Sequence, residues 1–112
     1  MTLREQQSLF AQLVGKLIEH AYANGMELTF SEAWRTPEQA KFNAAKGSGI
    51  SNSLHIDRLA IDLNLFQAGV YMTGTEAHRA LGEWWEQQHP LCRWGGRFND
   101  GNHYSLEWQG RK

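Results

Sequence analysis

The sequence predicts an α+β fold in which a small antiparallel sheet is flanked by two or three helices. Apolar residues recur at helical spacing through residues 3–24 and again through 76–88. Between them, residues 26–34 and 59–65 alternate between apolar and polar side chains, a pattern typical of half-buried strands. A chain of 112 residues is long enough to bury one core without disulfide bonds. We therefore expect a single domain over residues 1–112.

The first predicted helix runs from Leu3 to Asn24 and ends at Gly25, because glycine is the residue that most often terminates a helix. Its apolar face consists of Phe10, Leu13, Val14, Leu17, Ile18 and Ala21. A strand is predicted next over 26–34. The residues expected to face inward from this strand are Met26, Leu28 and Phe30.

A second helix is predicted to begin at Pro37 and to end near Lys46. Thr36 is a favourable N-cap residue, proline is favoured at the first helical position, and Gln39 stands three residues after the cap. Arg35 then lies at a corner between a strand and a helix. From this corner its side chain can reach a site outside the sheet.

The loop over residues 46–53 is rich in Gly, Ser and Asn, and we interpret it as a binding loop within the same domain. In the strand after it, Leu59, Ile61, Leu63 and Leu65 fall on one face, and Ala60, Asp62 and Asn64 fall on the other. A hairpin over 66–72 and a helix over 76–88 follow. Glycines punctuate 91–100 and allow close backbone approach, and a last strand is predicted over 103–108.

Three residues of types that bind metal ions stand at or beside the predicted strands: His55, Asp62 and His103. Catalytic zinc sites take three protein ligands, from His nitrogen and carboxylate oxygen atoms, and leave a position for water. Asp62 points away from the apolar face of its strand, and the preceding loop can deliver His55 to it. Pairing of the last strand with this strand would bring His103 alongside. We interpret the three residues as a metal site on the sheet face.

Each of these residues also has a plainer interpretation. His55 taken alone is more often an ordinary loop histidine than a ligand. Asp62 could be neutralised by a salt bridge to Arg58 or Lys46. The segment Asp100-Gly101-Asn102 has a composition that by itself favours a turn. The co-occurrence of these residues in one order is what distinguishes a site from such features.

Two motifs carry a resemblance to a known family. The order Ser-x-His-x6-Asp, followed downstream by an acid three residues before a second His, is matched by Ser53, His55, Asp62, Asp100 and His103. An arginine in an Arg-Thr-Pro-like segment is matched within 31–37. The pattern resembles the zinc peptidases of peptidoglycan, which include D-alanyl-D-alanine carboxypeptidases, the VanX and VanY enzymes, and phage L-alanyl-D-glutamate endolysins. The matched motifs extend over most of the chain.

The resemblance implies a role for each matched residue. His55, Asp62 and His103 would bind Zn²⁺, and Asp100 would be the catalytic base. Arg35 would stabilise a developing oxyanion or hold a substrate carboxylate, and Ser53 would contact the substrate. The family commonly has glycine where this chain has Arg58, and glycine tolerates backbone angles that arginine disfavours. Aspartate rather than glutamate at position 100 is more similar to the endolysin branch.

We therefore expect a zinc-dependent peptidase that cleaves peptidoglycan stem peptides, of the L-alanyl-D-glutamate endolysin type. One alternative is a D-alanyl-D-alanine carboxypeptidase or dipeptidase. Another is a zinc-stabilised wall-binding module that recognises wall peptide without cutting it. Asp100 distinguishes an enzyme from such a module, because a structural zinc site needs no free carboxylate beside it.

Composition argues against other classes of partner. The 11 Lys and Arg residues are balanced by 12 acidic ones, and a net charge of -1 gives no field that would attract nucleic acid. The lone Cys92 excludes an internal disulfide. No apolar run reaches the length of a membrane span, and no secretory leader opens the sequence. We expect a monomer that stays in the host cytoplasm until lysis and acts on the cell wall after release.

Overall fold

The computed structural model describes residues 1–47, 49–50 and 52–112. Its elements, in chain order, are α1 (Leu3–Ala23), β1 (Met26–Phe30), α2 (Pro37–Ala45), β2 (Ala60–Gln67), β3 (Val70–Met72), η1 (Glu76–His78), α3 (Arg79–Gln87), β4 (Cys92–Trp94), η2 (Gly95–Phe98) and β5 (His103–Leu106). The elements η1 and η2 are short 3-10 helices. The predicted binding loop over 46–53 includes Ser48 and Ser51, which lie outside the described residues.

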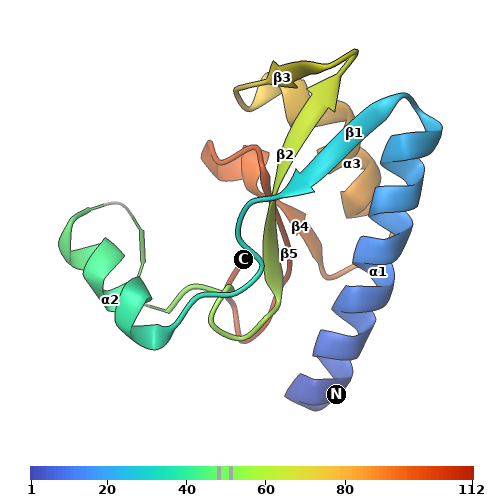
Figure 1. The fold of residues 1–112 in the computed structure, drawn as a ribbon. Helices are drawn as coiled ribbons and strands as arrows, with labels where there is room; N and C mark the ends of the chain where they lie inside the picture. The colour runs from blue at the N-terminus through green and yellow to red at the C-terminus, as the bar shows by residue number, and fades with distance from the viewer. Residues whose placement is uncertain (48, 51) are drawn as a thin grey trace.

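β2 is the central strand of an open antiparallel sheet ordered β1-β2-β5-β4 (Figure 1). β1 pairs with its C-terminal half, over residues 63–67. β5 pairs with residues 60–62, and β3 pairs with residues 65–67. The predicted α+β class, with an antiparallel sheet and three helices, is therefore confirmed.

The core lies between the sheet and the helices α1 and α3. α1 packs against β1 and β5, and α3 packs against β4. Several large core side chains have no exposed surface: Leu17, Leu63, Leu65, Trp85, Trp94, Tyr104 and Leu106. α2 lies apart from both core helices (Figure 1), and of its nine residues only Ala40 is buried. α2 therefore adds little to the core.

α1 confirms the first predicted helix. Gly25 follows it with a φ of 77°, an angle that glycine adopts readily. β1 ends at Phe30 rather than at Trp34. Phe30 is 65% exposed, so the prediction that it faces the core is wrong. Alternation predicts which face of a strand a residue occupies, but it does not predict how far that face is covered.

The second half of the chain differs from prediction mainly at short elements. The helix predicted over 76–88 is the 3-10 turn η1 followed by α3. We did not predict β4 and η2, because a three-residue strand followed by two glycines shows no period in the sequence. β5 ends at Leu106 rather than at Trp108. Within the described part of the chain, none of the helices has the length and hydrophobicity needed to cross a lipid bilayer.

Candidate active site

Asp62 and His103 are direct partners in the pairing of β2 with β5. Opposite residues of two antiparallel strands project to the same face of the sheet, so the register alone brings the carboxylate to the imidazole. Asp62 Oδ1 lies 3.4 Å from His103 Nδ1. The predicted pairing of these two strands is confirmed.

His55 reaches the same place from the turn that precedes β2. The Ile56 main-chain N–H donates to Ser53 O at 3.1 Å, which closes the turn. The Ser53 hydroxyl accepts a further hydrogen bond from the His55 main-chain N–H at 3.2 Å. With the backbone held in this way, His55 Nε2 lies 3.2 Å from Asp62 Oδ1.

Arg58 completes this turn with a left-handed backbone, at a φ of 56°. Glycine adopts this conformation readily, whereas arginine does so at a cost. A left-handed conformation costs a residue with a Cβ about 1–2 kcal/mol. The Arg58 guanidinium lies 4.5 Å from the centre of the Trp34 ring, and Trp34 Nε1 donates to Ile56 O at 3.0 Å. This cation–π contact offsets part of the backbone strain.

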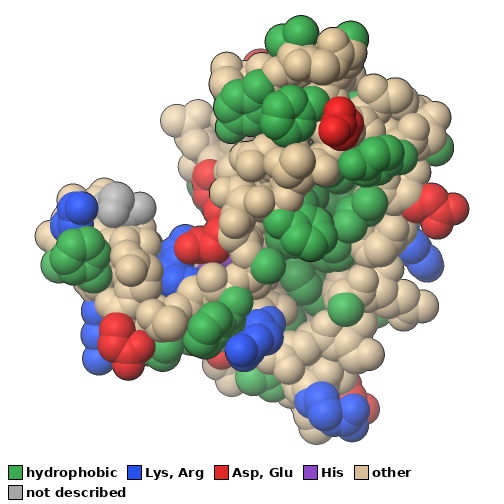
Figure 2. Space-filling model, in the orientation of Figure 1, with side chains coloured by type: hydrophobic (Ala, Val, Ile, Leu, Met, Phe, Trp, Pro, Cys, Tyr) green, Lys and Arg blue, Asp and Glu red, His purple; other side chains and the backbone are tan. Residues whose placement is uncertain are grey.

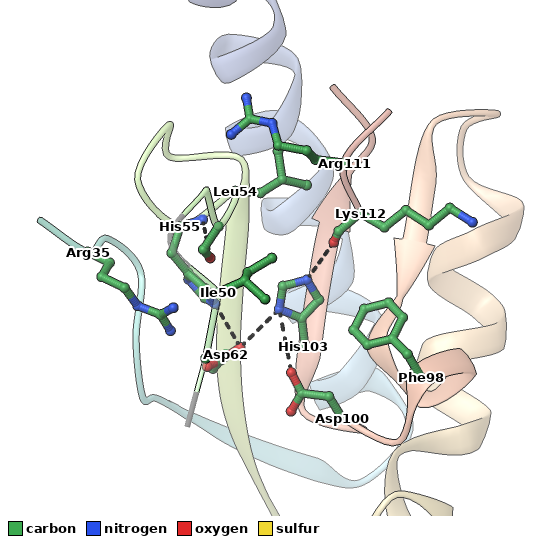
Figure 3. A pocket seen from close by; sticks show the side chains of 12 residues that line it. Arg35, Ile50, Leu54, His55, Asp62, Phe98, Asp100, His103, Arg111 and Lys112 are labelled. Atoms are coloured by element: carbon green, nitrogen blue, oxygen red, sulfur yellow. Dashed lines mark hydrogen bonds and ion pairs between the residues drawn. The ribbon is translucent and has the colours of Figure 1, made fainter. Parts of the chain in front are cut away.

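The three predicted metal ligands, His55, Asp62 and His103, offer ligand atoms that all lie within 4.8 Å of one another. Figure 3 shows both imidazoles directed toward the Asp62 carboxylate. Two atoms bonded to one tetrahedral zinc ion lie roughly 3.4 Å apart, close to the 3.2 and 3.4 Å that separate Asp62 Oδ1 from the two ring nitrogens. Within the described residues, Asp62 Oδ1 and His55 Nδ1 are buried without a hydrogen-bond partner. A divalent cation between the rings would satisfy the carboxylate oxygen.

The electrostatics of the three residues favour positive charge at their centre. Burial by itself would raise the pKa of Asp62, but the neighbouring His103 and His55 outweigh it and lower that pKa to about 2. Burial also opposes a charge on His103, yet Asp62 and the main-chain oxygen of Lys112 raise the pKa of His103 above its usual value. Both shifts share one cause, the partly buried Asp62 carboxylate that faces imidazole nitrogen atoms.

The C-terminal segment fixes the orientation of the His103 ring. His103 Nε2 lies 3.0 Å from the main-chain oxygen of Lys112, which also accepts a hydrogen bond from Ser105 Oγ at 3.0 Å. Nε2 therefore donates its proton to this oxygen, so that in the neutral ring the lone pair is on Nδ1, the nitrogen that faces the site. Arg111 holds this segment through an ion pair with Asp57 at 2.6 Å. We did not predict the role of Lys112, because a main-chain oxygen is common to every residue type.

Asp100 approaches the same nitrogen of His103 that faces Asp62, with its Oδ2 3.9 Å from His103 Nδ1. Its main-chain N–H donates to Gly95 O at 2.8 Å, and its main-chain oxygen accepts from the His103 N–H at 3.1 Å. The side chain is 51% exposed, and partial burial raises the pKa of its carboxyl group. A carboxylate that is close to a ligand atom but open to solvent has the position expected of a proton acceptor.

Arg35 lies between β1 and α2, at the corner where the sequence places it, and its main-chain N–H donates to His55 O at 3.2 Å. Its guanidinium is bound by Glu32. Arg35 Nε lies 3.1 and 3.2 Å from the two Glu32 carboxylate oxygens, and Nη2 forms an ion pair with Oε1. Glu32 Oε1 also lies 3.7 Å from His55 Nε2. The site therefore contains a carboxylate that we did not predict.

The sequence does contain a signal for Glu32. In an unbroken strand over 26–34, Glu32 would share the core face with Met26 and Leu28, where a carboxylate without a partner is costly. This conflict indicates that the strand does not continue regularly past Phe30.

No protein-family model and no curated protein matches this chain. Two of the solved structures that match it are peptidases. The L-Ala D-Glu endopeptidase ChiX of Serratia marcescens is 19% identical, with a TM-score of 0.71 over 88% of this chain and 77% of that chain. A mutant of the vancomycin-resistance D,D-pentapeptidase VanY from a VanB-type cassette, in complex with Zn(II), is 20% identical, with a TM-score of 0.59 over 87% of this chain and 70% of that chain. This chain has the fold of these two peptidases. The resemblance drawn from the sequence motifs is confirmed at the level of the fold.

The three candidate ligands line a cleft of about 450 Å³. Arg35 lies on one side of them and Phe98 on the other (Figure 3). Figure 2 shows acidic and basic side chains next to each other where the α2 segment joins the body, with a small histidine surface beside them. Ser53 also lines the cleft, but it is only 5% exposed and its hydroxyl holds the His55 backbone. Its contact with a substrate stays a prediction.

Proposed function

We propose that this chain is a zinc-dependent peptidase that cleaves stem peptides of peptidoglycan. The observation that carries the proposal is the convergence of His55, Asp62 and His103, whose ligand atoms lie within 4.8 Å of one another. The fold shared with ChiX and with zinc-bound VanY supports it. Asp100, which is close to these residues but half exposed, favours hydrolysis over a purely structural metal site.

Zinc bound by the three ligands would supply an acidified water molecule and a Lewis acid for the scissile carbonyl group. Asp100 accepts a proton from the attacking water and returns it to the leaving amine. Its carboxylate suits this task because it lies 3.9 Å from His103 Nδ1 and is not one of the three candidate ligands. The Lys112 main-chain oxygen keeps the His103 ring turned so that Nδ1 faces the site.

Arg35 supplies one of the positive charges that line the cleft beside the ligands. Its planar guanidinium stabilises the oxyanion that develops on the scissile carbonyl, or holds a carboxylate of the substrate. The side chain is 13% exposed and lines the cleft, so a bound peptide can contact it.

We infer that the bond cleaved is the one between L-alanine and D-glutamate. Aspartate at position 100 resembles the endolysin branch, and ChiX is an L-Ala D-Glu endopeptidase. The likeness to VanY, a D,D-pentapeptidase, favours the alternative in which terminal D-alanine is released. The proposal includes an endolysin role, in which a monomer made in the host cytoplasm reaches the wall after release.

Incubation of the zinc-loaded protein with purified peptidoglycan, with and without a chelator, tests the proposal. We expect chelator-sensitive appearance of new amino termini on D-glutamate, identified by mass spectrometry of the released fragments. Free D-alanine would instead support the carboxypeptidase alternative. Binding to peptidoglycan with no new amino termini would overturn the enzymatic assignment and favour a wall-binding module.

A further inference from the structure

The edge of the sheet is irregular next to the candidate metal ligands. β1 pairs regularly with β2 as far as Phe30, which lies opposite Leu63. Beyond this pair, the Ser31 N–H donates to Asp62 O at 2.9 Å, and the Asp62 N–H donates to Glu32 O at 2.8 Å. Two consecutive residues, Ser31 and Glu32, therefore face the single residue Asp62. This two-against-one pairing is a β-bulge, a feature that often occurs beside active sites and redirects a side chain there.

The bulge redirects the side chain of Glu32. Side chains alternate between the two faces of a regular strand, so without the extra residue Glu32 would point to the same face as Met26 and Leu28, which are buried in the core. The bulge resets this alternation. Glu32 Oε1 lies 3.7 Å from His55 Nε2, on the side of the sheet that carries the site. The extra residue of the bulge thus turns the Glu32 side chain from the core face of the sheet to the face that carries the site.

Glu32 is engaged with Arg35 rather than directed at a metal position. Both Glu32 carboxylate oxygens lie within 3.2 Å of Arg35 Nε, and Oε1 also pairs with Nη2. The Arg35 side chain is 13% exposed and that of Glu32 is 30% exposed, so the pair is partly shielded from water. A bidentate contact of this kind fixes both the position and the orientation of a guanidinium group. The Arg35 backbone is tied to the His55 main-chain oxygen as well.

We propose that Glu32 is a positioning residue that acts through Arg35. Resting on the proposed function, the inference is that Glu32 holds the guanidinium at a fixed position beside the metal ligands, where it meets the substrate carbonyl oxygen or carboxylate. Glu32 also balances the Arg35 charge next to a bound divalent cation. Because the bulge bonds Ser31 to the main-chain oxygen of Asp62 and Glu32 to its N–H, a single irregularity sets the arginine and the metal ligand in one register.

A double-mutant cycle on the zinc-loaded full chain tests the inference. Glu32→Gln keeps the shape of the side chain but removes its charge, and we expect kcat/KM on peptidoglycan fragments to fall by roughly 10²-fold, the loss typical of a displaced catalytic group. In an Arg35→Ala background, the same Glu32→Gln change should alter kcat/KM by less than about threefold, because Glu32 then has nothing to position. Glu32→Asp, which keeps the charge, should recover part of the activity.

The separate kinetic constants decide what Glu32 positions Arg35 to do. A fall in kcat at constant KM in Glu32→Gln indicates that the guanidinium stabilises the oxyanion, whereas a rise in KM indicates that it holds a substrate carboxylate. Glu27→Gln is the matched control, because Glu27 is an exposed glutamate of β1, the strand that leads into the bulge. We expect this control to leave both constants and the zinc content unchanged.

Three results would overturn the inference and leave the proposed function standing. The first is a Glu32→Gln variant that is as active as a wild-type protein shown to cleave peptidoglycan. The second is an equal loss with and without Arg35, which would show that Glu32 acts independently. The third is loss of zinc from Glu32→Gln, which would show an action on the metal. If Glu32→Gln does not fold, the same cycle with Glu32→Asp applies, with a smaller loss that disappears in the Arg35→Ala background. An inactive wild-type protein would instead refute the proposed function.

Discussion

Asp62 is the residue that connects the separate segments of the site. Its Oδ1 lies between the two histidine rings, and its main-chain N–H and oxygen bond to the bulge at Glu32 and Ser31. Burial opposes a charge on this carboxyl group, but the histidines lower its pKa to about 2, so it is ionised at neutral pH. A partly buried, ionised carboxylate is stabilised by a positive partner, and a metal ion shared with both rings would provide one.

Asp100 and His103 are three residues apart, and their variants should fail in different ways. We expect Asp100→Asn to retain zinc and to lose about 10²- to 10⁴-fold in kcat, because it removes a proton acceptor and no ligand. His103→Ala should lose zinc and activity together. Metal analysis of the purified variants and peptide cleavage assays measure both effects. Retained cleavage by Asp100→Asn would exclude it as the base, and a zinc-replete, active His103→Ala would exclude His103 as a ligand.

Arg58 gives a prediction that concerns stability alone. Its φ of 56° strains a side-chain-bearing residue, while its guanidinium gains a contact with Trp34. Arg58→Ala loses the contact and keeps the strain, whereas Arg58→Gly loses both. We expect the glycine variant to be more stable than the alanine variant by about 1 kcal/mol, measured by urea unfolding. Equal stabilities would show that the turn relaxes when the arginine is removed.

At the scale of elements, the sequence predicts what depends on local pattern. The position of α1 follows from its periodicity, and that of α2 from its Thr36 cap and Pro37. The alternation of β2 places Asp62 correctly away from the core leucines. Glu32 at a core-facing position indicates an irregularity after Phe30, but the form of the bulge could not be predicted, because it depends on hydrogen bonds between segments far apart in the sequence.

Gly95 shows how an element without sequence periodicity still places a site residue. A Cβ at this position would lie 2.1 Å from Asp100 O and 2.6 Å from His103 Cβ. We expect Gly95→Ala to destabilise the protein by about 1–3 kcal/mol and to displace the Asp100 loop, with reduced cleavage. Gly15→Ala on α1 is the control, because a Cβ there meets nothing within 4 Å and alanine favours helix. Thermal unfolding and cleavage assays compare the two, and an active, stable Gly95→Ala would contradict the close packing.

At the scale of the whole molecule, the site is completed by segments from across the chain, and one of them, the C-terminal segment, contains none of the motif residues. The C-terminal segment orients His103 through the Lys112 main-chain oxygen and is held by Arg111 to Asp57. Glu32 enters from the end of β1, and the turn before β2 supplies His55. The sequence therefore predicts the chemical groups that could bind metal, because their residue types are specific. It does not predict the contacts that orient them, because these use main-chain atoms and pairings set by the complete fold.

Because the candidate ligands come from the turn before β2, from β2 and from β5, zinc should stabilise the folded chain as a whole. A ligand that binds only the folded state adds about 2.7 kcal/mol when its free concentration is about 100 times its Kd. For a domain of this size that corresponds to a rise in Tm of roughly 10 °C. We expect zinc to raise Tm and a chelator to reverse the rise, as measured by thermal unfolding. Asp100→Asn should keep this response and His103→Ala should lose it. A zinc response that survives His103→Ala would place the ion elsewhere, since the ligand set would then lack a nitrogen that the β2–β5 register supplies.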